Sequence, residues 1–203
     1  MLNVNSIHFI LSCNKFIDDL VTDLNYLCKQ HGINDTKIRS FYKTYNIANR
    51  FDDANTIYVK RMLQHVLPEE IRKNVVALLF KKYVGVSQKN FSSKLYMNTK
   101  EVSELVKNGM FVGSHGSAHN WLNKISEDQQ KKDIVSSLAF LEEVKAPTSN
   151  WIMCYPYGAY NKKTISLLKK LGASVGITTE VRKAIIGKDN PLTLPRFDTN
   201  DFL

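Results

Sequence analysis

The sequence predicts an α/β protein, with a mainly helical first half and a second half of short parallel strands alternating with helices. Two observations support this prediction. Apolar residues recur at helical spacing as far as Asn108-Gly109. Beyond that point, short apolar runs alternate with helical segments, which is typical of parallel α/β architecture. The length of 203 residues favours one domain, or one domain with a helical elaboration.

Helix signals dominate the first half. One helix is indicated by the apolar spacing between Phe16 and Cys28, and Gly32 is a plausible stop. Pro68, followed by two glutamates, begins another, because proline and acidic residues suit a first helical turn. Two more helices are expected over residues 53–65 and from Thr99 to about residue 108.

In the second half, strands and helices are expected in alternation. The strands are expected over residues 110–113, 151–154, 173–178 and 192–197. The helices between them should run from Ser126 to about Val144 and from Asn161 to Leu171, with Gly172 as a stop.

Composition sets limits on partners and compartment. The net charge is +9, but the basic residues are spread along the chain without a nucleic-acid motif, so we expect no nucleic-acid partner. The three cysteines match no zinc or redox spacing, and the first residues do not form a signal peptide. These features favour a reducing, cytoplasmic setting. No apolar run approaches the ~20 residues that would span a bilayer.

The strongest chemical signal is the histidine pair His115 and His119, directly after the expected strand at 110–113. Two histidines four apart at a strand end can converge on one metal ion, because neutral imidazole is a preferred zinc ligand. Such loops are also where α/β enzymes place their chemistry. On spacing alone, two polar residues in a surface turn are the favoured interpretation.

Two weaker signals come later in the chain. The segment Cys154-Tyr155-Pro156-Tyr157-Gly158 ends a strand in a tight turn, which can aim a backbone amide at a substrate oxygen. Its aromatics, together with Trp121, can stack on a sugar. Further on, Arg196 and Asp198 should share one face of a strand, as an ion pair or as groups that orient a catalytic residue.

The order of these segments resembles the polysaccharide deacetylase family, carbohydrate esterase family 4, over roughly residues 95–203. Ser114-His115-x-x-x-His119 resembles its second motif, and Tyr155-Pro156-Tyr157-Gly158 its third. The resemblance implies a distorted parallel (β/α) barrel, of which this chain would hold a part. It also implies hydrolysis of an N-acetyl or O-acetyl group on an acetylated polysaccharide, with a divalent metal, most often zinc. Of the two we expect the N-deacetylase type, a hydrolase of non-peptide carbon–nitrogen bonds.

The resemblance also assigns roles to residues. It implies that His115 and His119 are metal ligands. The Tyr157 amide would bind the oxyanion, and Tyr155 and Pro156 would line the site beside Trp121. Cys154 stands where the family often has an arginine, and Arg196 is a candidate to take over its orienting role. Residues 1–95 would be a helical insertion or cover, and 96–203 the barrel portion.

The chain departs from the family at the paired aspartates of the first strand. Phe51-Asp52-Asp53 is the only comparable pair, but the residues after it indicate a helix capped by Asp52 or Asp53. We therefore expect the catalytic aspartates to belong to an N-terminal segment outside this sequence. Two alternatives stay open: a non-catalytic glycan-binding remnant of the family, and a basic helical interaction module.

Overall fold

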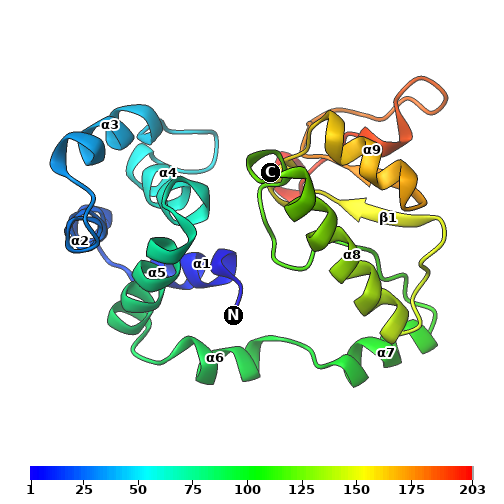
Figure 1. Ribbon diagram of the computed structural model, residues 1–203, viewed down its shortest axis with the longest axis horizontal. Helices are drawn as coiled ribbons and strands as arrows, with labels where there is room; N and C mark the ends of the chain where they lie inside the picture. The colour runs from blue at the N-terminus through cyan, green and yellow to red at the C-terminus, as the bar shows by residue number, and fades with distance from the viewer. Residues whose placement is uncertain (203) are drawn as a thin grey trace. The chain divides into compact units, whose positions relative to one another are not determined.

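The computed structural model describes residues 1–202 and divides the chain into two compact units (Figure 1). The first unit, Met1–Tyr96, is built from helices and their connecting turns. The second begins at Met97 and combines helices with a small parallel sheet. No helix of the described residues is long and apolar enough to cross a membrane.

The first unit, called the helical unit below, is built around a single apolar core. Its helices are α1 (Asn3–Cys13), α2 (Ile17–Gln30), α3 (Asp35–Tyr45), α4 (Ala54–Arg61), α5 (Glu69–Val84) and α6 (Gln88–Leu95). A π-helical stretch, Met62–Val66, continues α4. Fully buried residues such as Ile10, Leu24, Tyr58 and Leu79 bring α1, α2, α4 and α5 together, so burial of apolar surface holds this unit.

The helices expected around Asp53 and Pro68 are confirmed. The Asp53 side chain caps α4 by accepting a hydrogen bond from the backbone N–H of Thr56 at 2.9 Å. Asp52 pairs with Lys60 at 2.7 Å, and Phe51 lies in a bend and is 59% exposed. The Phe-Asp-Asp segment therefore begins a helix and does not end a buried strand.

Three helices of this unit, α1, α3 and α6, were not predicted from the sequence. The helix α3 buries only Ile38, and α6 buries no residue completely. In α3, Ile38, Phe41 and Tyr45 recur at helical spacing and pack against the core, so this helix had a visible apolar pattern that was not used. The short α6 has only Phe91 in that core. Both helices are also marked by their caps, since Asn34 and Ser87 accept hydrogen bonds from backbone amides of the first turns.

The second unit holds α7 (Thr99–Lys107), α8 (Glu127–Glu143), α9 (Lys162–Lys170), β1 (Trp151–Cys154) and β2 (Ala173–Ile177). The strands pair in parallel, with Ile152 opposite Val175 and Cys154 opposite Ile177, and α9 connects them. Capping boxes at Ser126 and Asn161 begin α8 and α9, as the sequence predicted.

The predictions of strands at 110–113 and 192–197 are wrong. Only single parallel bridges form there, between Ser114 and Met153 and between Leu194 and Ile177. Residues 191–193 form a 3₁₀ turn, and Pro195 has no amide to donate to a ladder. The sheet is thus two strands extended by one residue on each side. This sheet is smaller than the sheet of the expected barrel portion. That the second unit is part of a (β/α) barrel remains a prediction.

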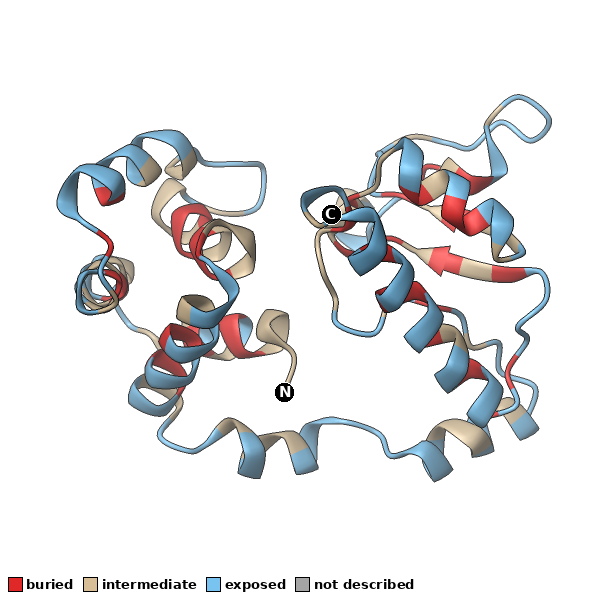
Figure 2. Cartoon of the chain, viewed as in Figure 1, coloured by how far each residue is buried: buried red, intermediate tan, exposed pale blue. Residues whose placement is uncertain are grey.

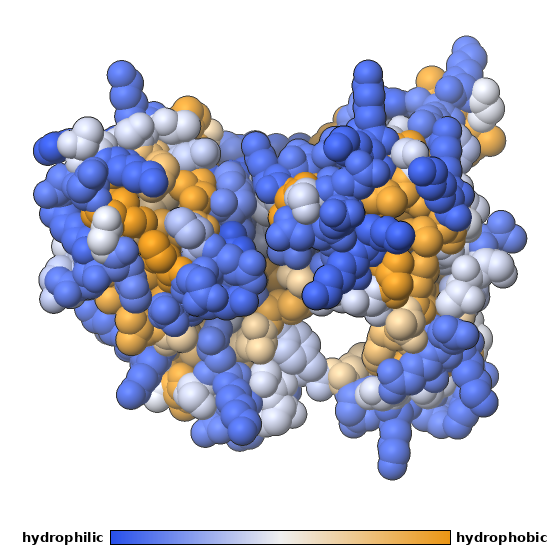
Figure 3. Space-filling view, in the orientation of Figure 1, coloured by the Kyte–Doolittle hydropathy of each residue, from blue (hydrophilic) through white to orange (hydrophobic). Residues whose placement is uncertain are grey.

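The core of the second unit lies around β1. Trp151, Met153 and Tyr155 are almost completely buried and pack with residues of α8 and α9. Figure 2 shows buried positions along the strand and on the two helices of this unit. The two helices are also joined by a buried hydrogen bond from Thr164 Oγ1 to Gln130 Oε1 at 2.7 Å. Hydrophilic residues cover most of the visible face of each unit, with smaller apolar areas among them (Figure 3).

Candidate functional site

The histidine-bearing loop begins at the edge of the sheet. The Ser114 amide donates to the Ile152 carbonyl at 2.9 Å, and the Cys154 amide donates to the Ser114 carbonyl at 2.9 Å. His115 therefore starts directly beside the carboxyl end of β1. Parallel α/β proteins bind ligands at this end of their strands.

The structure brings the two predicted histidines together. The ring centroids of His115 and His119 lie 4.7 Å apart, with the rings nearly perpendicular. His115 Nδ1 lies 2.6 Å from the carbonyl oxygen of Cys154. A carbonyl only accepts hydrogen bonds, so Nδ1 of the neutral imidazole carries the proton and Nε2 keeps its lone pair. This is how a metal-binding histidine is oriented.

Asp133 of α8 holds the histidine loop, and no role for it was predicted from the sequence. It is 5% exposed and accepts hydrogen bonds from the backbone amides of Ser117 at 3.2 Å and Ala118 at 2.9 Å. Gly116 has a φ of 71°, and a Cβ there would collide with the Asp133 carboxylate. The sequence did contain a signal for this role: Asp133 is a charged residue next to the apolar Ile134, on the buried face of α8.

Tyr157 and Trp121 complete the ring cluster. Trp121 stacks on Tyr157 with centroids 4.8 Å apart and planes 18° from parallel, and the Tyr157 ring lies edge-on to His119 at 4.7 Å. His119 and Tyr157 both have positive φ, 54° and 57°. Left-handed backbone at non-glycine residues is strained and concentrates at functional sites, so its presence at two touching residues supports a site here.

Tyr155 and Pro156 lie beneath the site. Tyr155 is 1% exposed, and its hydroxyl donates to the Leu192 carbonyl at 2.6 Å. Pro156 is buried, and it would contact a Cβ added to Gly116, so it packs beneath the histidine loop. In this structure both residues support the site from the core, whereas we expected them to line it.

A polar cluster of three side chains includes His115. Arg196 Nη1 lies 3.4 Å from Cys154 Sγ, so the arginine does reach the position that the sequence suggested. Hydrogen bonding with the Cys154 side chain raises the pKa of His115. The same contact, assisted by the charge of Arg196, lowers the pKa of the Cys154 thiol. Arg196 thus adds positive potential beside the His115 imidazole.

A cleft opens between the histidine loop and α8. Its volume is about 410 Å³, and its lining includes His115, Ser117, Ser137 and Phe140. That volume falls in the range of ~300–1,000 Å³ that is usual for small-molecule sites. The cleft places His115 beside both serine and apolar side chains of the second unit.

The histidine pair meets part of what a catalytic zinc ion requires. Its imidazoles are close, and His115 is oriented by a carbonyl, which suits two metal ligands. Across residues 1–202, however, no group of three histidine, cysteine, aspartate or glutamate side chains could hold an ion. The described residues therefore fit two ligands of a divalent ion and not a complete set of three.

Comparison with known proteins identifies the family. The polysaccharide deacetylase family matches residues 44–176, and this chain belongs to it. A putative polysaccharide deacetylase of Bacillus subtilis, YxkH, is 27% identical over 92 residues, or 45% of this chain. This chain spans about a third of the length of that curated relative, 33%.

One solved structure is also similar, the deacetylase PplD of Streptococcus pyogenes in complex with acetate. The similarity covers 88% of this chain and 79% of PplD, at 20% identity and a TM-score of 0.47.

Proposed function

We propose that this chain provides the histidine-bearing part of a metal-dependent deacetylase that hydrolyses acetyl groups on the amino sugars of a polysaccharide. Family membership supports the class of hydrolase. The observation that carries the proposal is the convergence of His115 and His119 beside the aromatic pair Trp121 and Tyr157 at the carboxyl end of β1.

In this proposal His115 and His119 are two ligands of a divalent ion, most suitably zinc. When bound, such an ion supplies electrophilic activation of the acetyl carbonyl and of water. The Cys154 carbonyl keeps the Nε2 lone pair of His115 available. Asp133 fixes the loop between the two histidines through the amides of Ser117 and Ala118, so their separation is set before any ligand binds.

The remaining residues act on the substrate. The backbone amide of Tyr157, in the turn after β1, is the proposed donor to the oxyanion of the tetrahedral intermediate. Arg196 is a positioning residue that holds the end of β1 through Cys154 and keeps the local potential positive. Trp121, stacked on Tyr157, offers an aromatic face for a sugar ring.

The direct test is acetate release from acetylated amino-sugar oligomers, with and without added zinc, by this chain fused to a segment that supplies the paired aspartates of the family. O-acetylated oligomers assayed in parallel identify the bond that is cleaved. Zinc-dependent release that is lost in His115→Ala and His119→Ala, but kept in the control His31→Ala, is the expected result. Binding of the oligomer without any acetate release would contradict the enzyme proposal and support a non-catalytic glycan-binding remnant.

A further inference from the structure

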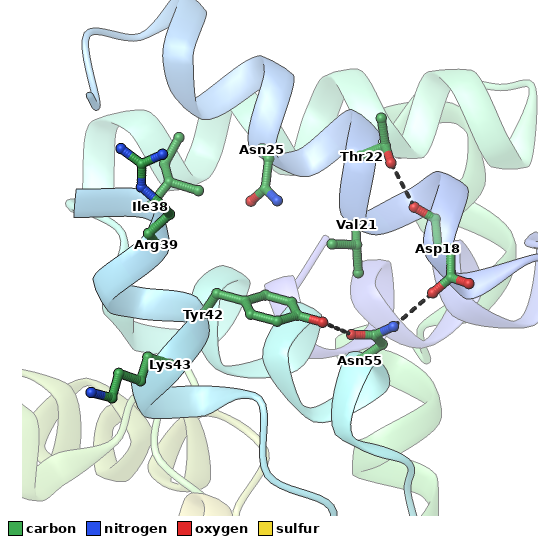
Figure 4. Close-up of a pocket in the computed structure, with 9 residues that line it drawn as sticks. All are labelled: Asp18, Val21, Thr22, Asn25, Ile38, Arg39, Tyr42, Lys43 and Asn55. Carbon is green, nitrogen blue, oxygen red and sulfur yellow. Dashed lines mark hydrogen bonds between the residues drawn. The ribbon is translucent and has the colours of Figure 1, made fainter. Parts of the chain in front are cut away.

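The helical unit contains a second cavity, which the deacetylase site does not use (Figure 4). Its volume is about 460 Å³, within the usual range of ~300–1,000 Å³ for small-molecule sites. Three helices form it: α2 contributes Asp18, Val21, Thr22 and Asn25; α3 contributes Ile38, Arg39, Tyr42 and Lys43; and α4 contributes Asn55. We refer to it as the α2–α3 groove.

The groove contains an aromatic ring that is held in place before any ligand arrives. Tyr42 packs edge-on to the buried Tyr58, with ring centroids 4.9 Å apart. Its hydroxyl donates to Asn55 Oδ1 at 2.7 Å, and Asn55 Nδ2 donates to Asp18 Oδ1 at 2.7 Å. Figure 4 shows this chain of hydrogen bonds crossing the groove. Tyr42 is 37% exposed, so part of a fixed ring stays accessible.

Polar groups with unused hydrogen-bonding capacity surround this ring. Asn25 Oδ1 accepts from the Tyr58 hydroxyl at 2.7 Å, while its Nδ2 meets no acceptor in the described part of the chain. The second carboxylate oxygen of Asp18 is likewise not engaged by a described side chain. A ring face beside an amide donor and a carboxylate acceptor suits a sugar, which has an apolar C–H face and hydroxyls that both donate and accept.

Positive charge lies along the opposite side of the groove. Arg39, Tyr42 and Lys43 stand three and four residues apart, so they share one face of α3. Neither Arg39 nor Lys43 forms an ion pair with any side chain between residues 1 and 202. Residues 1–96 contain 14 lysines and arginines and 8 aspartates and glutamates, so their net charge is +6, out of +9 for the whole chain. This charge favours an anionic ligand.

We propose that the α2–α3 groove binds a sugar residue that carries an anionic group, a carboxylate or a phosphate, with the ring against Tyr42 and the anion at Arg39 and Lys43. The occupant is a unit of an acidic glycan. In that respect the inference rests on the proposed function, because the glycan would be the polymer on which the deacetylase acts. The α2–α3 groove would then select acidic polysaccharides through a binding site that is separate from the site of hydrolysis.

The test is an NMR titration of the whole chain with glucuronic acid, glucose 6-phosphate and glucose, which share a ring and differ in charge. Acetate and inorganic phosphate serve as probes without the ring. At least one anionic sugar should shift the groove resonances and bind more tightly than glucose and than its matching free anion. The tighter of the two anionic sugars identifies the anionic group.

Variants make the test specific. Arg39→Gln with Lys43→Gln should weaken binding roughly tenfold, which corresponds to about 1.4 kcal/mol. Both side chains are exposed, so the fold should persist. Lys81→Gln removes an exposed cation of α5 outside the groove lining and should leave affinity unchanged. Tyr42→Phe, which keeps the ring and loses the bond to Asn55, should weaken binding less than the double variant does.

The inference is overturned if no anionic sugar binds, if glucose or the free anions bind equally well, or if Lys81→Gln weakens binding as much as the groove variant. These results do not depend on catalysis. In the fusion that supplies the paired aspartates, the groove variant should still release acetate from a short neutral acetylated oligomer at the wild-type rate. Loss of acetate release in the histidine variants, with sugar binding intact, would separate the two sites.

Discussion

Replacing Asp133 with alanine should destabilise the second unit and loosen the histidine loop. The carboxylate is 5% exposed and accepts two backbone amides, from Ser117 and Ala118. Each hydrogen bond to a charged acceptor contributes ~1.5–3 kcal/mol. Water can replace part of this in the variant, so we expect the free energy of unfolding to fall by about 3 kcal/mol.

Urea denaturation followed by tryptophan fluorescence measures this change in the correct part of the chain. Both tryptophans, Trp121 and Trp151, belong to the second unit. Asp133→Asn keeps one acceptor oxygen and nearly the same volume, so its loss should be about half as large. Glu142→Ala, an exposed carboxylate near the end of the same helix, is the control and should change stability by less than about 0.5 kcal/mol.

If Asp133→Ala unfolds at the same urea concentration as the control and its histidine resonances are also unchanged, then the carboxylate does not hold the loop, and the separation of the histidines has another cause. A stable variant with disordered histidine resonances would show that Asp133 orders the loop without adding net stability. That outcome would refute the magnitude and leave the positioning role.

Three further predictions concern individual side chains. Asp53→Ala should cost about 1 kcal/mol of helical-unit stability by circular dichroism, whereas Asp53→Asn should keep the cap and any acetate release; loss of release in Asp53→Asn would make this residue catalytic. Hydrogen bonds from Thr56 lower the pKa of Asp53, so the stability it adds is full above the ordinary carboxyl pKa and is lost as pH falls through the lowered value. Burial raises the pKa of Cys28 to about 11, so a maleimide should label exposed Cys13 in the native chain and Cys28 only after unfolding, as mass spectrometry would reveal. Trp121→Ala should raise KM for the glycan several-fold and leave zinc affinity unchanged, since a stacked aromatic contact contributes ~0.5–1.5 kcal/mol; an equal loss of zinc affinity would contradict a purely substrate-binding role.

Local signals in the sequence predicted several elements well. The caps at Asp53, Ser126 and Asn161 begin helices as expected, because a short polar side chain that accepts a first-turn amide is visible in sequence. Strands at 151–154 and 173–178, joined by a helix that ends at Gly172, were also expected, and β1, α9 and β2 confirm them closely. Parallel architecture was predicted from this alternation, whereas the direct pairing of these two strands is a finding of the structure.

Features that depend on contacts between distant parts of the chain could not be predicted from the sequence. The apolar run 110–113 resembled a strand, yet Met110 and Phe111 are more than half exposed and only Ser114 pairs with β1. Whether a short apolar run becomes a strand depends on a partner supplied by distant residues. Asp133 was missed for the same reason, because its partners lie 15 and 16 residues earlier in the chain.

At the site, too, local features were predicted from the sequence and non-local ones were not. The histidine spacing and its position after an apolar run predicted that His115 and His119 would lie close together, and their rings do. The sequence could not show that Tyr155 is directed into the core while Tyr157 reaches the histidines. Alternation of side chains is reliable along a regular strand, but the left-handed turn at Tyr157 breaks it.

The most direct test of the central claim is a zinc titration followed through the imidazole resonances of all five histidines. We predict that His115 and His119 shift together with one common affinity, while His8, His31 and His65 do not change. His115→Ala should also abolish the response of His119, since neither ring alone holds the ion. Independent shifts of His115 and His119, or a response of His119 that survives His115→Ala unchanged, would contradict the metal-binding pair on which the proposed deacetylase function depends.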